Sequence, residues 1–161
     1  MPRYWLLKTE PGVFSFADLL TAPGRTTLWE GVRNVQARNF LREMRRGEWA
    51  LIYHSNAHPA GVAGVAEIVG EAAPDPTQFD THSPYFDAKA TSEAPRWNVV
   101  TVAAVAALPR FVTLAELRAR PELQSMKLLQ KGNRLSVTPV TAAEFSVIVG
   151  LGGLSSLEEA P

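Results

Sequence analysis

The segment from Leu28 to Ser55 constrains the fold of this chain most strongly, because it places a turn, one helix and one strand directly after one another. Asn34 is positioned to cap the start of the helix, and Gly47 follows its end, where a left-handed residue needs no Cβ. An apolar strand, 49–53, comes next. We therefore expect a short amphipathic helix that packs on a sheet. The apolar residues of this expected helix are spaced so that they form one face of it: Ala37, Phe40, Leu41 and Met44.

The remaining strand-forming runs are not separated by long regular helices, which a doubly wound parallel sheet would require. Capping residues predict short helices that begin near Ser15, Thr113 and Thr141. The pattern favours an α+β fold, with a small curved mixed sheet or barrel and short helices at its periphery. The expected strands are 3–8, 49–53, 62–69, 96–108 and 134–140.

The segment 72–95 contains four prolines and almost no periodicity. We expect a long ordered loop there, since loops of this length in small domains are usually functional or mobile. Its carboxylates Asp75, Asp80 and Asp87 are interpreted as solvated charges. Residues 1–151 are expected to form a single domain, and residues 152–161 a flexible C-terminal tail.

The composition is that of an ordinary globular protein of 161 residues, with 46% apolar residues and a formal net charge of zero. No apolar run approaches the roughly 20 residues of a membrane-spanning helix. The N-terminus also lacks the pattern of a secretory signal. A monomeric cytoplasmic protein without membrane contact is therefore expected. The absence of cysteine excludes disulfides, thiolate nucleophiles and cysteine-bound zinc.

The sequence contains no clear catalytic motif. The three histidines, His54, His58 and His82, have no third ligand at a zinc-binding spacing. There is no G-x-S-x-G elbow, and GLGG at 150–153 is neither a Walker loop nor a dinucleotide fingerprint. We therefore expect no metal, no cofactor and no enzymatic activity.

Binding chemistry has more support. Trp29 precedes a glycine turn and a basic helix, where a flat ring can stack on a nucleobase. A core position for Trp29 is the other open interpretation. Asn34 is open in the same way, because its amide can cap a helix or bind a base edge. The arginines of 33–46, opposed only by Glu43, could bind phosphates or simply face solvent: Arg33, Arg38, Arg42, Arg45 and Arg46.

Several motifs closely resemble those of the EVE domain, in the expected order over residues 3–150. EVE domains include bacterial one-domain proteins and the thymocyte nuclear protein family, and they belong to the PUA-like superfamily. The resemblance implies a small curved-sheet barrel flanked by helices, and a single EVE domain over residues 1–151. The motifs are YWLLKTEP at 4–11, WEGVRNVQARNFLREM at 29–44, YHSN at 53–56, GVAGVAEIV at 61–69, SPYFD at 83–87, PRWNVV at 95–100 and RLSVTPVT at 134–141.

The related YTH domains read methylated bases in RNA, and the resemblance implies a similar aromatic base pocket here. Trp29 matches one wall of that pocket, and Trp97 is the nearest counterpart of a further cage tryptophan by element order. The carboxylates Glu10 and Glu30 favour a modified cytosine, whose exocyclic amine donates hydrogen bonds. The other implied pocket residues lie at strand ends or in the turn before the helix: Lys8, Thr9, Asn34, Tyr53, His54 and Ser55.

These features predict a non-enzymatic reader of modified bases in DNA or RNA, with the arginine-rich helix on the phosphates. Two alternatives from other functional classes remain open. One is an enzyme that acts on a nucleotide-like small molecule in the same pocket, and the other is a protein-interaction module.

Overall fold

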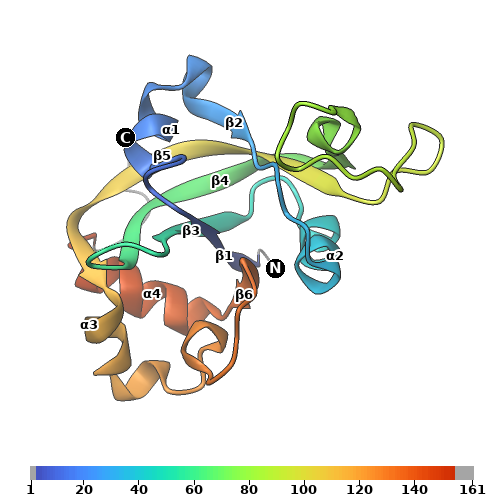
Figure 1. The fold of residues 1–161 in the computed structure, drawn as a ribbon. Coiled ribbons are helices and arrows are strands. Elements are labelled where there is room, and N and C mark those ends of the chain that lie inside the picture. The colour runs from blue at the N-terminus through green and yellow to red at the C-terminus, as the bar shows by residue number, and fades with distance from the viewer. Residues whose placement is uncertain (1–2, 155–161) are drawn as a thin grey trace.

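A six-stranded mixed sheet forms the centre of the computed structural model, which describes residues 3–154 (Figure 1). The strand order is β2-β5-β4-β3-β1-β6. β1 runs parallel to β3, and the other neighbouring strands are antiparallel. The predicted α+β class with a mixed sheet is confirmed, but the sheet stays open, with β2 and β6 at its edges. The strands are β1 (Tyr4–Thr9), β2 (Thr26–Leu28), β3 (Trp49–His54), β4 (Gly61–Pro74), β5 (Asn98–Thr113) and β6 (Val137–Val140).

The helices are short, and their starts are fixed by side-chain caps. Asn34 Oδ1 accepts the N–H of Ala37 at 3.0 Å, as predicted. Thr113 and Thr141 each form a capping box at the start of α3 and α4. Within the described part of the chain, no helix is both long and apolar enough to cross a membrane. The helices are α1 (Phe16–Thr21), α2 (Val35–Glu43), α3 (Leu114–Arg118) and α4 (Ala142–Leu151), with 3₁₀ turns η1 (Pro23–Arg25), η2 (Pro76–Phe79), η3 (Pro121–Leu123) and η4 (Lys127–Leu129).

The sheet separates two hydrophobic clusters. Side chains of successive strand residues point to opposite faces, so Leu6 packs in one cluster and Trp5 and Leu7 in the other. The Leu6 cluster contains residues of α3 and α4, which lie together on one side of the sheet in Figure 1. The Trp5 cluster contains residues of α1 and α2. The helices around Trp29 therefore rest on a different core from α3 and α4.

The segment between β4 and β5 has little regular structure, as predicted, yet buried polar groups anchor it. Gln78 is fully buried, and its Nε2 donates to the carbonyl oxygens of Asp75 at 2.8 Å and Trp97 at 2.9 Å. Its Oε1 accepts the N–H groups of Arg96 at 2.9 Å and Trp97 at 3.0 Å. One side-chain amide thus joins the two ends of the segment.

Two features differ from the sequence-based expectations at the edges of the fold. The three-residue strand β2 was not predicted, because so short a run has no measurable periodicity. The expected tail begins with residues that pack on the body: Gly152 O accepts the N–H of Arg110 at 2.9 Å, and Leu154 is buried. The rest of that tail, 155–161, lies outside the described residues.

Candidate functional site

A solvent-open cavity of about 890 Å³ lies where β1 and β3 end. Because these strands are parallel neighbours, their carboxyl ends meet, and the N–H of Ser55 donates to Thr9 O at 2.9 Å. The wall continues through the 13–14 loop, residues 27–32 around Trp29, Tyr85, and the segment before β6. Six of the predicted pocket residues line this cavity: Lys8, Thr9, Glu10, Trp29, Glu30 and Ser55.

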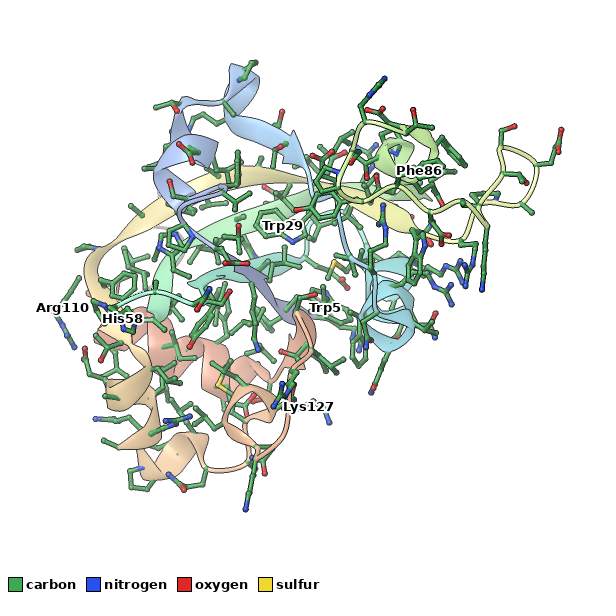
Figure 2. The ribbon with its side chains drawn as sticks, viewed as in Figure 1. Trp5, Trp29, His58, Phe86, Arg110 and Lys127 are labelled. Atoms are coloured by element: carbon green, nitrogen blue, oxygen red, sulfur yellow. The ribbon has the colours of Figure 1, made fainter. Side chains whose placement is uncertain are left out.

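Trp29 is both a core residue and part of the cavity wall. Only 6% of its surface is exposed, and its ring packs edge-on against Phe14, with ring centroids 6.4 Å apart. The backbone N–H of Trp29 donates to Val100 O at 2.8 Å, which continues the pairing of β2 with β5. Figure 2 shows Trp29 near the centre of the molecule, whereas Phe86 lies out on the segment between β4 and β5. The ring is therefore held rigidly, with a limited surface available to a ligand.

The turn after Trp29 is held by a buried carboxylate. Asp75 is fully buried, and its Oδ2 accepts the N–H of Gly31 and a guanidinium N–H of Arg33, both at 2.9 Å. Its Oδ1 accepts the N–H of Thr77 at 2.8 Å and the Thr77 hydroxyl at 2.6 Å. Burial raises the pKa of Asp75, but the hydrogen bonds from Thr77, Gly31 and Arg33 outweigh burial and hold the pKa below its usual value. The interpretation of Asp75 as a solvated charge is wrong.

Tyr85 forms a wall of the cavity that the sequence did not identify as part of the site. Gly31 has a φ of +84°, and a Cβ on it would lie 2.7 Å from the Tyr85 ring. The Arg33 guanidinium donates to Tyr85 O at 3.0 and 2.7 Å. The glycine after Trp29 is therefore needed both for its backbone conformation and for contact with this ring. That glycine was the available signal, but its partner is distant in the sequence.

Two carboxylates give the cavity hydrogen-bond acceptors. Glu10 accepts a hydrogen bond from Asn56 Nδ2 at 3.0 Å. Burial, together with the nearby charge of Asp75, raises the pKa of Glu30 above its usual value, although Arg33 opposes this shift. Burial lowers the pKa of Lys8, the cation at the end of β1. Such a wall can accept hydrogen bonds from a ligand amine beside an aromatic surface.

Four predicted pocket residues are not part of the cavity wall. Asn34 is used as the α2 cap, and Tyr53 is buried in the Leu6 cluster. His54 Nε2 accepts the N–H of Phe16 at 3.1 Å, and burial lowers the pKa of this imidazole. Trp97 Nε1 donates to Asp87 Oδ2 at 2.7 Å, so Asp87 is also more than a solvated charge. Only the last residue of the Tyr53–Ser55 run reaches the cavity, because the strand has ended there.

The arginines predicted to bind phosphate are mostly bonded to the protein. Arg33 pairs with buried Asp75, Arg38 Nη1 donates to Arg96 O at 2.8 Å, and Arg42 Nε donates to Asn98 Oδ1 at 2.7 Å. Arg45 Nη1 donates to the carbonyl oxygens of Arg42 and Met44, each at 3.1 Å. None of the five arginines, Arg46 included, lines the cavity.

Metal binding has no support from clustering in residues 3–154. Within that range, no group of three or more His, Cys, Asp or Glu residues could hold an ion.

Comparison with known proteins places this chain among a group of relatives. The family model described as "EVE domain" matches residues 3–151. Thymocyte nuclear protein 1 of Homo sapiens is 42% identical over 94% of this chain and 74% of its own length. A hypothetical protein from Leishmania major has a TM-score of 0.90 at 46% identity, with 94% of this chain and 95% of that chain covered.

Two further solved structures contain nucleic acid. Human THYN1 protein, in complex with 5-methylcytosine-containing DNA, has a TM-score of 0.89 at 41% identity, covering 96% of this chain and 99% of that chain. The YTH domain of Zygosaccharomyces rouxii MRB1 protein, in complex with N6-methyladenosine RNA, has a TM-score of 0.53 at 13% identity, covering 96% and 89%. At that identity, the second similarity concerns the fold alone.

Proposed function

This chain belongs to the EVE domain family, and we propose that it binds nucleic acid and recognises a modified base in the cavity beside Trp29. The single observation that supports this most is the position of Trp29 in the same cavity wall as Glu10 and Glu30. A base taken out of a stack needs an aromatic or apolar surface and a few fixed polar groups at its edge. The human relative in complex with 5-methylcytosine-containing DNA supports the same proposal.

A modified cytosine fits the wall better than a base that offers only acceptors. The N4 amine of cytosine donates hydrogen bonds, which carboxylate oxygens accept. Glu10 and Glu30 can supply these acceptors, and the rigid Trp29 wall can contact the face or edge of the ring.

The first experiment measures binding of 5-methyl-2′-deoxycytidine and 2′-deoxycytidine by calorimetry. We expect the methylated nucleoside to bind more tightly. Trp29→Phe should weaken its binding by about threefold, because phenylalanine keeps an aromatic ring but offers less of a stacking surface whose complete loss costs about 1–3 kcal/mol. Trp29→Ala is a poorer test, since loss of a buried tryptophan costs about 3–5 kcal/mol of stability.

Trp49→Phe is the matched control, because Trp49 packs against the Leu6 cluster and is not in the cavity wall. Each variant is melted alongside its titration. A Trp29→Phe protein that melts lower but binds 5-methyl-2′-deoxycytidine as tightly as the unmodified protein would show that Trp29 acts only as a core residue. Turnover of a nucleoside library by the purified protein would instead favour the enzyme alternative.

A further inference from the structure

The cavity has its own cations, and they differ from the arginines of α2. Lys8 and Arg134 both line it. Arg134 is exposed, and among residues 3–154 its side chain makes no hydrogen bond or ion pair with another residue. The arginines of α2 instead fasten that helix to the start of β5, through Arg38 to Arg96 O and Arg42 to Asn98. These contacts already use part of the guanidinium groups of Arg38 and Arg42, whereas the Arg134 side chain has no such contact among the described residues.

Strand pairing brings Arg134 to the cavity. Leu7 pairs with Val137 in the antiparallel β1–β6 pair, and the N–H of Lys8 donates to Ser136 O at 2.9 Å. The segment that precedes β6 therefore runs beside the end of β1. Lys8 and Arg134 therefore both line the cavity although they lie far apart in the sequence.

The segment before β6 is also held in place. Asn133 Nδ2 donates to Lys127 O at 2.7 Å, and Asn133 Oδ1 accepts the N–H of Leu135 at 2.9 Å. Lys127, at the start of η4, is labelled in Figure 2. A fixed backbone lowers the ordering cost that Arg134 would otherwise add to binding.

The distribution of charge matches a nucleotide. Glu10 and Glu30 would repel a phosphate but accept hydrogen bonds from a base amine, whereas Lys8 and Arg134 attract the phosphate. We propose that Lys8 and Arg134 bind the phosphate of the nucleotide whose base enters the cavity. The sugar-phosphate backbone of the nucleic acid would then follow residues 131–136 and not α2. This inference rests on the proposed function of the cavity. Burial of Lys8 disfavours its charge, and a bound phosphate would offset that cost.

The test compares Arg134→Ala with Arg42→Ala, which removes the same charge from α2. The probe is a fluorescein-labelled 12-nucleotide single strand with one central 5-methylcytosine, titrated from 50 to 300 mM NaCl. For Arg134→Ala we expect affinity at low salt to fall on the order of tenfold, as for loss of a charged hydrogen bond. The slope of log affinity against log salt should become shallower by about 0.7, the value for one phosphate contact on a single strand. Arg42→Ala should leave the slope unchanged.

A second titration separates this inference from the proposed function. The nucleoside 5-methyl-2′-deoxycytidine has no phosphate, so Arg134→Ala should weaken nucleoside binding less than it weakens binding of the strand, whereas Trp29→Phe should weaken both. An unchanged salt slope in Arg134→Ala, or an equal change of slope in Arg42→Ala, overturns the proposed phosphate contact of Arg134. This holds even if the protein still prefers the methylated base. The unmodified protein is also titrated with the same strand carrying plain cytosine. A shallower slope in Arg134→Ala, together with no preference of the unmodified protein for the methylated strand, would support the phosphate site and refute modified-base recognition.

Discussion

The substitution Asp75→Ala tests how the turn after Trp29 is held. It removes the acceptors of four hydrogen bonds, from the N–H of Gly31, the Arg33 guanidinium, and the N–H and hydroxyl of Thr77. Removing one partner of a buried ion pair costs about 3–5 kcal/mol, because the other charge is left unpaired. Arg33 retains 22% side-chain exposure and can reach water, so we expect a loss near the lower value.

Thermal melting measures this loss. About 3 kcal/mol corresponds to a fall in Tm of roughly 6–12 °C for a domain of this size. Asp80→Ala is the control, since Asp80 is an exposed carboxylate of the same segment that accepts one N–H, from His82. Nucleoside affinity should also fall in Asp75→Ala, because the Gly31 turn forms part of the cavity wall.

The pH dependence of stability gives a second test of the same carboxylate, with the substitution Asp75→Asn. The folded pKa of Asp75 lies below its usual value, so Asp75 stabilises the fold above the unfolded pKa of about 3.9 and loses this effect as the pH falls through the folded pKa. The stability difference between the unmodified protein and Asp75→Asn should therefore shrink below about pH 4. A Tm change in Asp75→Ala no larger than in Asp80→Ala would refute the role assigned to the buried carboxylate.

Two further predictions concern single positions. Gly31→Ala should lower the Tm more than Gly47→Ala: both glycines have positive φ, at +84° and +88°, but only at Gly31 would a Cβ meet the Tyr85 ring, at 2.7 Å. Backbone strain alone costs about 1–3 kcal/mol, so equal melting of the two variants would refute the contact with Tyr85. The hydrogen bond from Arg110 holds the pKa of Glu116 at about 2. The unmodified protein should therefore be more stable than Glu116→Gln above about pH 4.3, and this difference should disappear as the pH falls towards 2. A pH-independent difference in chemical denaturation would contradict it.

Local patterns in the sequence predicted most elements of this fold. The helix cap at Asn34 and the capping boxes at Thr113 and Thr141 could be predicted, because each depends on residues only three positions apart. The resemblance to YTH domains implied that Thr9 and Ser55 lie at opposite edges of the pocket, whereas the structure brings them together because β1 and β3 end side by side. Parallel pairing itself was not predicted, because no local signal specifies the partner strand.

The rest of the cavity depends on contacts between distant segments. Asp75 and Tyr85 lie in a segment without periodicity, and nothing in the sequence showed that both would contact the turn at Gly31. The resemblance to YTH domains implied that Tyr53 and His54 line the pocket, but Tyr53 packs in the Leu6 cluster and His54 accepts the N–H of Phe16. Arg134 was overlooked because the arginines of α2 are closer together in sequence.

The buried amide of Gln78 has a consequence for variation in chain length. It takes the place of a peptide group between the two ends of the segment that joins β4 and β5, so that the hairpin is closed near its base. Asp87 adds a second closure through Arg96 and Trp97. The exposed residues 91–95 lie beyond both closures. We therefore expect insertions or deletions there to change the length of a tip whose ends are already joined, and to leave the shape of the cavity unchanged.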